Sequence, residues 1–79
     1  MKLLVRNLER TTSEHEIRVL FSSHGTVTKC NLVLDQKTSQ SKGFAFVEMP
    51  NENEAKTAIE KLHLSTVDNS KIRVKLAQN

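Results

Sequence analysis

The stretch that decides the fold of this chain is Lys42-Gly43-Phe44-Ala45-Phe46-Val47-Glu48-Met49. In a strand, successive side chains point to opposite faces, so Phe44 and Phe46 share one face. The other face would carry Ala45, Val47 and Met49. Pro50 stops the strand. A strand that is apolar on both faces is usually buried on both faces, so the rest of the sequence must show whether this chain can cover it.

The residues after Pro50 predict a helix and a last strand. Asn51 and Glu54 resemble a helix capping arrangement. Apolar residues then follow with the i, i+3, i+4, i+7 spacing of one helix face, at Ala55, Ala58, Ile59 and Leu62. Residues 64–70 form a connection. Residues 72–77 alternate as in a strand, with Ile72, Val74 and Leu76 on one face and Arg73, Lys75 and Ala77 on the other.

The residues before Lys42 have a similar order. Residues 3–5 predict a short strand, and Ser13 with Glu16 forms a capping box at a helix start. One apolar stripe follows, made of Ile17, Leu20 and Phe21, and Gly25 is placed as the left-handed residue after the helix end. Residues 27–34 predict the second strand, with Cys30, Leu32 and Leu34 on one face and Lys29, Asn31 and Val33 on the other. Residues 35–42 form a polar loop.

The predicted order, βαββαβ, is that of an α+β ferredoxin-like sandwich: a four-stranded antiparallel sheet with both helices on one face. We expect residues 1–79 to form a single domain, because a chain of 79 residues has room for one sheet and one layer of helices. The second sheet face must then meet water. Phe44 and Phe46 would lie bare on that face, and exposed paired aromatics suggest a ligand.

Composition excludes several classes of protein. Cys30 is the only cysteine, and no Cys/His pair has zinc-ligand spacing, so we expect no disulfide, metal or other cofactor and a reducing compartment, the cytoplasm, or the nucleus in a eukaryote. Only residues 3–5 run apolar near the start, which predicts neither a signal peptide nor a membrane partner. The net charge is only +3, so the placement of the charges matters more than their sum.

The octamer of residues 42–49 resembles the K/R-G-F/Y-G/A-F-V-x-F/Y motif of the RNA-recognition motif family at seven positions, with Met49 in place of the last aromatic. Residues 3–8, Leu-Leu-Val-Arg-Asn-Leu, resemble the family's hexamer, with Leu4 where an aromatic is usual. The resemblance covers nearly the whole chain. A chain that starts at Met1 with no linker suggests a stand-alone domain, like the short single-domain members of bacteria.

This resemblance implies that single-stranded RNA binds the helix-free face, with bases stacked on Phe44 and Phe46 and phosphates held by basic residues. The candidate site residues are Leu4, Arg6, Lys29, Asn31, Lys42, Phe44, Phe46, Glu48, Arg73 and Lys75. Lys42 would pair with a phosphate and Asn31 with a base edge, and Gln78 and Asn79 are further candidates for base contacts. With Leu4 one stacking platform is lost, so binding should be weak or confined to few bases. Single-stranded DNA is a possible second ligand, and we expect a monomer.

Other functions stay open or are disfavoured. The main alternative is a protein-binding adaptor of the same fold that uses the sheet or the helical face, with Phe44 and Phe46 covered by a partner or a second copy. Arg73 and Lys75 could simply keep a sheet edge soluble. An enzyme is disfavoured, because no glycine-rich phosphate loop, paired carboxylate site or nucleophile with a base is evident.

Overall fold

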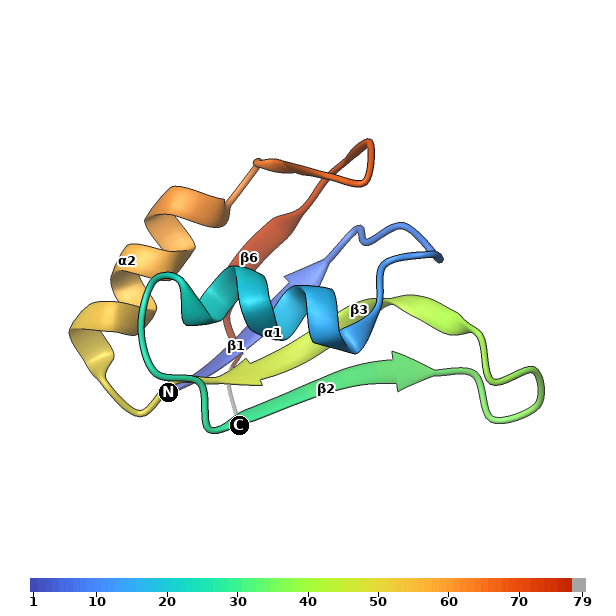
Figure 1. The fold of residues 1–79 in the computed structure, drawn as a ribbon, viewed down its shortest axis with the longest axis horizontal. Coiled ribbons are helices and arrows are strands. Elements are labelled where there is room, and N and C mark those ends of the chain that lie inside the picture. The colour runs from blue at the N-terminus through green and yellow to red at the C-terminus, as the bar shows by residue number, and fades with distance from the viewer. Residues whose placement is uncertain (78–79) are drawn as a thin grey trace.

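The computed structural model describes residues 1–77, so the predicted base contacts of Gln78 and Asn79 lie outside the described residues. The elements along the chain are β1 (Lys2–Arg6), α1 (Glu14–Ser22), β2 (Lys29–Leu34), β3 (Ser41–Glu48), α2 (Glu52–Leu62), β4 (Thr66–Val67), β5 (Ser70–Lys71) and β6 (Arg73–Leu76) (Figure 1). The predicted βαββαβ order is confirmed, with the short β4–β5 hairpin added between α2 and the last strand.

The main sheet is antiparallel, with the strand order β2-β3-β1-β6. The two central strands are β3 and β1, so the aromatic stretch lies in the middle of the sheet. Val47 lies opposite Leu3 of β1 and Cys30 of β2, and Val5 lies opposite Val74 of β6. Figure 1 shows α1 and α2 covering the same face of this sheet. The predicted ferredoxin-like sandwich is confirmed.

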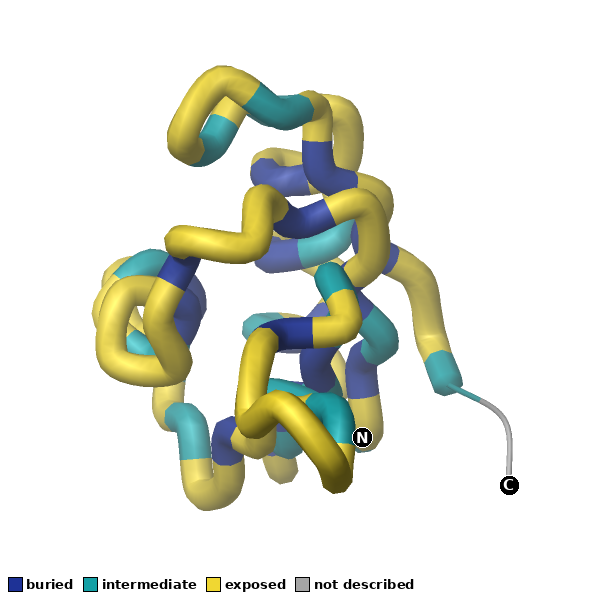
Figure 2. Tube along the Cα trace, turned by 90° about the vertical axis from the view of Figure 1, so that its right-hand side faces the viewer, coloured by how far each residue is buried: buried dark blue, intermediate teal, exposed yellow. Residues whose placement is uncertain are grey.

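The core lies between the helices and the covered sheet face. From α1 it receives Ile17 and Phe21, which are almost completely buried. From α2 it receives Ala55 and Ala58, whose small side chains let the helix approach the sheet closely. The inward residues of the strands add Leu3, Val5, Cys30, Ala45, Val47 and Val74. Leu62 of α2 and three residues outside the helices and strands, Leu8, Met49 and Ile72, complete it. In Figure 2 the buried segments recur on the strands and helices, while the loops are mostly exposed.

Side-chain caps fix both helix starts. Ser13 accepts a hydrogen bond from the Glu16 backbone N–H at 3.1 Å, and the Glu16 carboxylate accepts from the Ser13 N–H at 3.2 Å, so the predicted capping box is present. At α2, Asn51 Oδ1 accepts from the Glu54 N–H at 3.1 Å. The Glu54 carboxylate, however, accepts from the Thr26 N–H at 3.0 Å. This contact ties the α1–β2 loop to α2.

The prediction that Gly25 is a left-handed cap is wrong. Its φ is 159°, which is nearly extended, and the helix instead ends at Ser22, with Ser23 as a C-cap residue whose φ is −70°. Glycine is needed here for space, because a Cβ at this position would lie 2.5 Å from the Cβ of Glu54. The physical reason for Gly25 is therefore the close approach of α2 to the loop.

Several predicted boundaries shift by one or two residues. The second strand begins at Lys29 and not at residue 27, and the third begins at Ser41. Ile72 lies just outside β6, and its N–H donates to the Ser65 carbonyl. The predicted connection 64–70 contains the β4–β5 hairpin, whose turn residues Asp68 and Asn69 have positive φ values of 49° and 70°. No helix within residues 1–77 is long and apolar enough to cross a membrane.

Candidate nucleic-acid interface

We call the sheet surface that the helices leave uncovered the open sheet face. The strand registers arrange its side chains in rows across β2, β3, β1 and β6. The middle row is Asn31, Phe46, Leu4 and Lys75. A second row consists of Lys29, Glu48 and Lys2. At the other end of the face, Arg6 lies opposite Arg73.

Alternation along β3 adds Phe44 to the same face. The register of β2 and β3 shifts before Ala45, and the exposed Lys42 lies beyond this shift, where it lines one hollow together with Arg6 and Phe44. The fold therefore brings all ten predicted residues to one surface. They come from four strands that are far apart in sequence but adjacent in the sheet.

Phe44 and Phe46 form a pair at the centre of the open sheet face. Their ring centroids lie 6.2 Å apart with an interplanar angle of 87°, an edge-to-face arrangement that aromatic pairs favour. Both side chains are half-buried, so the expectation that they lie bare is corrected. Part of the cover comes from Lys2, whose Nζ lies 4.7 Å from the centroid of the Phe46 ring. Lys2 was not among the predicted site residues.

Glu48 is the one carboxylate among the predicted site residues. It lies opposite Lys2 on β1 and Lys29 on β2. Its Oε1 accepts a hydrogen bond from the Thr28 hydroxyl at 3.2 Å, and it forms no ion pair with any described residue. The other oxygen of this carboxylate can accept a hydrogen bond from a base amino group at that edge of the sheet.

The basic residues of the open sheet face form no ion pair within residues 1–77, although Glu48 lies opposite Lys2 and Lys29. The ion pair found in this part of the chain is Lys56–Glu52 on α2. Arg6 and Arg73 are directly opposed on neighbouring antiparallel strands. Like charges in this position destabilise a sheet. An anion bound between the two guanidinium groups would remove the repulsion.

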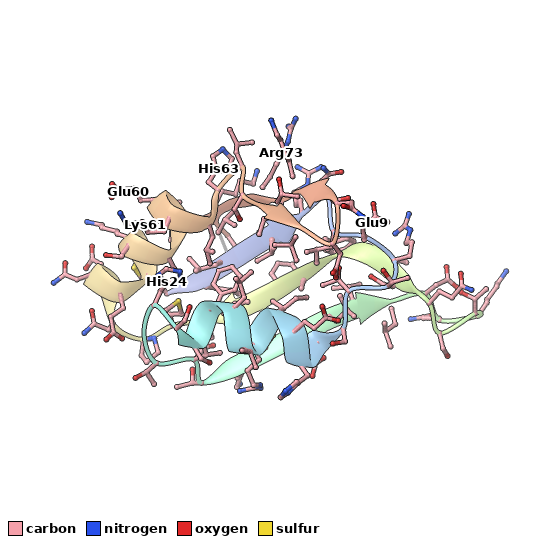
Figure 3. The ribbon with its side chains drawn as sticks, turned by 45° about the horizontal axis from the view of Figure 1, so that its top comes forward. Glu9, His24, Glu60, Lys61, His63 and Arg73 are labelled. Carbon is pink, nitrogen blue, oxygen red and sulfur yellow. The ribbon has the colours of Figure 1, made fainter. Side chains whose placement is uncertain are left out.

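The acidic residues of the helices and the basic residues of the open sheet face make the two sides of the molecule differ in charge, although the helices also carry Arg18, Lys56 and Lys61. Acidic residues start both helices, Glu14 and Glu16 on α1 and Glu52 and Glu54 on α2, where they interact favourably with the helix dipole. The open sheet face carries lysine and arginine. In Figure 3, Glu60 and Lys61 lie on α2, so this helix carries charges of both signs, and Arg73 of β6 lies away from Glu60. An anionic ligand is therefore favoured on the sheet side.

The β2–β3 loop is folded on itself. Asp35 Oδ1 accepts hydrogen bonds from the backbone N–H groups of Thr38 at 3.1 Å and Lys37 at 2.8 Å. These two bonds lower the pKa of the Asp35 carboxyl. On the covered face, burial together with the Glu14 carboxylate raises the pKa of the Cys30 thiol, so Cys30 is a core residue whose thiol is kept protonated and unreactive.

The fold and this surface define a class of protein: a ferredoxin-like domain with an aromatic, basic, uncovered sheet. The profile of the family described as RNA recognition motif matches residues 3–73. The chain belongs to the RNA recognition motif family, a family of RNA-binding domains and not of enzymes. The matched range includes all of the predicted site residues except Lys75.

Relatives and solved structures agree with this assignment. The chain is 36% identical over 77 residues both to the chloroplastic RNA-binding protein CP31B of Arabidopsis thaliana and to the chloroplastic 28 kDa ribonucleoprotein of Spinacia oleracea. It aligns over 98% of its own length but spans only 27% and 33% of these two proteins.

Among solved structures, RNA-binding protein PG1 superposes with a TM-score of 0.96 at 37% identity, covering 100% of this chain and 95% of that chain. The Sxl-lethal protein/RNA complex superposes with a TM-score of 0.94 at 32% identity, covering 99% of this chain and 47% of that one. The chain is thus an RNA-binding domain homologous to a protein solved with RNA.

Proposed function

We propose that the open sheet face binds short single-stranded RNA by stacking bases on Phe44 and Phe46. The observation that carries the proposal is the position of this aromatic pair, 6.2 Å apart at the centre of the uncovered sheet, among cations without acidic partners in residues 1–77. The homologous protein solved as an RNA complex supports it.

The energies are consistent with a weak binding site. Stacking on an aromatic contributes about 1 to 3 kcal/mol per base, so two rings supply about 2 to 6 kcal/mol. Micromolar affinity requires about 8 kcal/mol. Phosphate contacts and hydrogen bonds to base edges must supply the difference. Leu4, which lies between Phe46 and Lys75 in the middle row, offers apolar contact but no π face.

Each residue of the face has a proposed role. Lys42, at the start of β3, holds a phosphate, and Lys29 and Lys75 hold phosphates at the two outer strands. Arg6 and Arg73 bind a phosphate between them, because the two residues are register partners on neighbouring strands and one anion can neutralise both charges. Asn31 and Glu48, next to Phe46 and Lys29 in the rows, contact base edges.

The same proposal covers partners and location. Stacking does not sense the 2′-hydroxyl, so single-stranded DNA should compete for the rings. Residues 1–79 act as one domain, and this domain is a monomer, because RNA and not a second copy covers Phe44 and Phe46. The cytoplasm, or the nucleus in a eukaryote, remains the expected location, although the two plant relatives are chloroplastic.

The test is the binding of a labelled pool of mixed-sequence RNA hexanucleotides, measured by fluorescence anisotropy. Phe44→Ala and Phe46→Ala should each weaken binding by about 5- to 150-fold, which corresponds to the loss of about 1 to 3 kcal/mol of stacking. Circular dichroism should show that both variants remain folded, because both side chains lie outside the core.

The matched control is Val19→Ala, which removes an apolar side chain that is 55% exposed on α1, the layer opposite the open sheet face. It should leave RNA affinity unchanged. If both phenylalanine variants are folded and bind RNA as tightly as the wild type does, the stacking proposal is contradicted.

A further inference from the structure

Beside the open sheet face lies a hollow of about 400 Å³, and part of its wall, including Glu9, Arg10 and Ser70, is not among the predicted site residues. It lies where the end of β1 and the following loop meet the start of β3 and the β4–β5 hairpin. The lining residues that matter here are Arg6, Glu9, Arg10, Lys42, Phe44 and Ser70. Since Arg6, Lys42 and Phe44 also belong to the open sheet face, the hollow is continuous with it.

Hydrogen bonds hold the walls of this hollow in place. The Leu8 N–H donates to the Gly43 carbonyl at 2.9 Å, which ties the loop to β3. The Thr12 hydroxyl donates to Asp68 at 2.7 Å, and the Ser70 hydroxyl donates to Glu9 Oε1 at 2.6 Å. The loop is therefore joined to two other elements, and the hollow exists without a ligand.

Arg10 is fixed at the wall of the hollow. Its Nη1 donates to the Ser41 carbonyl at 2.9 Å. It lies so close to the β3 backbone that a Cβ at Gly43 would be 2.8 Å from Nη1. One N–H is used in this bond, so most of the five guanidinium donors remain available. The guanidinium is thus prepositioned for a ligand.

The charges of the hollow favour an anion. Arg6, Arg10 and Lys42 contribute three cations, and none of them has an ion pair within the described residues. Glu9 is the one carboxylate among the lining residues, and the hydrogen bond from Ser70 occupies one of its oxygens. Arginine beside lysine, with an aromatic ring at one side, is a set of groups suited to the phosphate and sugar of a nucleotide.

We propose that this hollow binds one further nucleotide of the strand on the open sheet face, with its phosphate held by Arg10 and Lys42. The inference rests on the proposed RNA binding and extends it, because it adds a contact that only a strand longer than the aromatic platform can reach. Arg10 is the residue that distinguishes the hollow from the sheet, since Lys42 borders both.

The experiment compares a mixed-sequence RNA trinucleotide pool with a hexanucleotide pool by NMR titration of the labelled protein. Arg10→Gln should weaken hexanucleotide binding by about three- to tenfold and leave trinucleotide binding unchanged. The salt slope for the hexanucleotide should also fall by about 0.7. The amides of Glu9, Arg10 and Gly43 should shift with the hexanucleotide and not with the trinucleotide.

Two further variants sharpen the result. Glu9→Gln removes the opposing charge and keeps an oxygen that accepts from Ser70, so it should strengthen hexanucleotide binding by about twofold. This variant also serves if Arg10→Gln disturbs the fold. Arg18→Gln is the matched control, because it removes the same charge from α1, away from the hollow, and should change neither affinity.

The outcomes separate the two proposals. If Arg10→Gln weakens the binding of both RNAs equally, or of neither, the proposal that the hollow binds a further nucleotide is contradicted, while the proposed site on the open sheet face is unaffected. Both proposals are supported if Phe46→Ala weakens trinucleotide binding while Arg10→Gln leaves it unchanged and weakens only hexanucleotide binding. If the wild type binds neither RNA, the sheet proposal fails and the hollow fails with it.

Discussion

At the scale of single residues, the contact between Lys2 and Phe46 determines the state of the free binding surface. The ammonium group lies 4.7 Å from the ring centroid, within the range of a cation–π interaction. Such a contact at an exposed site contributes about 0.5 to 1 kcal/mol. A stacked base contributes about 1 to 3 kcal/mol, so RNA is expected to displace the lysine from the ring.

This contact predicts a measurable coupling between the two residues. In a double-mutant cycle of Lys2→Met and Phe46→Leu, the interaction term in the free energy of unfolding should be about 0.5 to 1 kcal/mol. Both substitutions keep apolar bulk, so the cycle isolates the charge and the ring. Urea denaturation of the four proteins measures it. Independent, additive effects of the two substitutions would show that the ammonium does not hold to the ring in solution.

The residues that were predicted and those that were missed differ in the kind of signal they leave in the sequence. Phe44, Phe46 and Arg73 follow strand alternation, which determines a face before any contact is known. Lys2 obeys the same rule and would have been found by extending the first strand by one residue. Arg10 lies in a loop without periodicity, and its position depends on a long-range bond to Ser41 that no local pattern encodes.

At the scale of elements, the pairing of β1 with β6 places Arg6 opposite Arg73. This arrangement reduces the stability of the free protein, because two like charges face each other across neighbouring strands. It also creates a site where two guanidinium groups can share one phosphate. Stability and binding are therefore expected to change in opposite directions when this pair is broken.

Arg73→Thr tests this relation. It should raise the free energy of unfolding by about 0.2 to 1 kcal/mol at low salt and weaken RNA binding. The matched control is Lys75→Thr on the same strand and face, since Lys75 lies opposite Leu4 and not opposite a cation. Both variants introduce the same β-branched residue, so differences in strand propensity cancel. Urea denaturation measures the free energy of unfolding of each variant, and fluorescence anisotropy measures its RNA affinity. A lower stability for Arg73→Thr than for Lys75→Thr would contradict the repulsion.

The elements that were predicted correctly combine a periodic pattern with a side-chain signal at the start or end. Both helices had an apolar stripe and a capping residue, and β3 was closed by Pro50. The β4–β5 hairpin was missed because strands of two residues are too short to show alternation. Its one local signal was the pair Asp68-Asn69, which tolerates the positive φ of a tight hairpin turn.

At the scale of the whole molecule, the two layers differ in charge. The helical layer carries the acidic first turns of α1 and α2, and the sheet layer carries a group of lysines and arginines that form no ion pair within residues 1–77. This polarity is expected to orient an approaching polyanion so that it meets the sheet first. A partner protein bound through apolar contacts would gain much less from such a field.

Salt dependence is the consequence of this polarity that distinguishes an RNA ligand from a protein partner. Each phosphate neutralised on a single strand releases about 0.7 counterions, so about three contacts predict a log–log slope near −2 for the affinity. Anisotropy titrations of a short RNA over a series of salt concentrations measure this slope, and Lys42→Ala should make it less steep by about 0.7. Because phosphate contacts carry no sequence information, that variant should weaken all RNA sequences about equally. A slope near zero would mean that the bound ligand does not use the cations of the sheet, and the protein-adaptor alternative would then account better for Phe44 and Phe46.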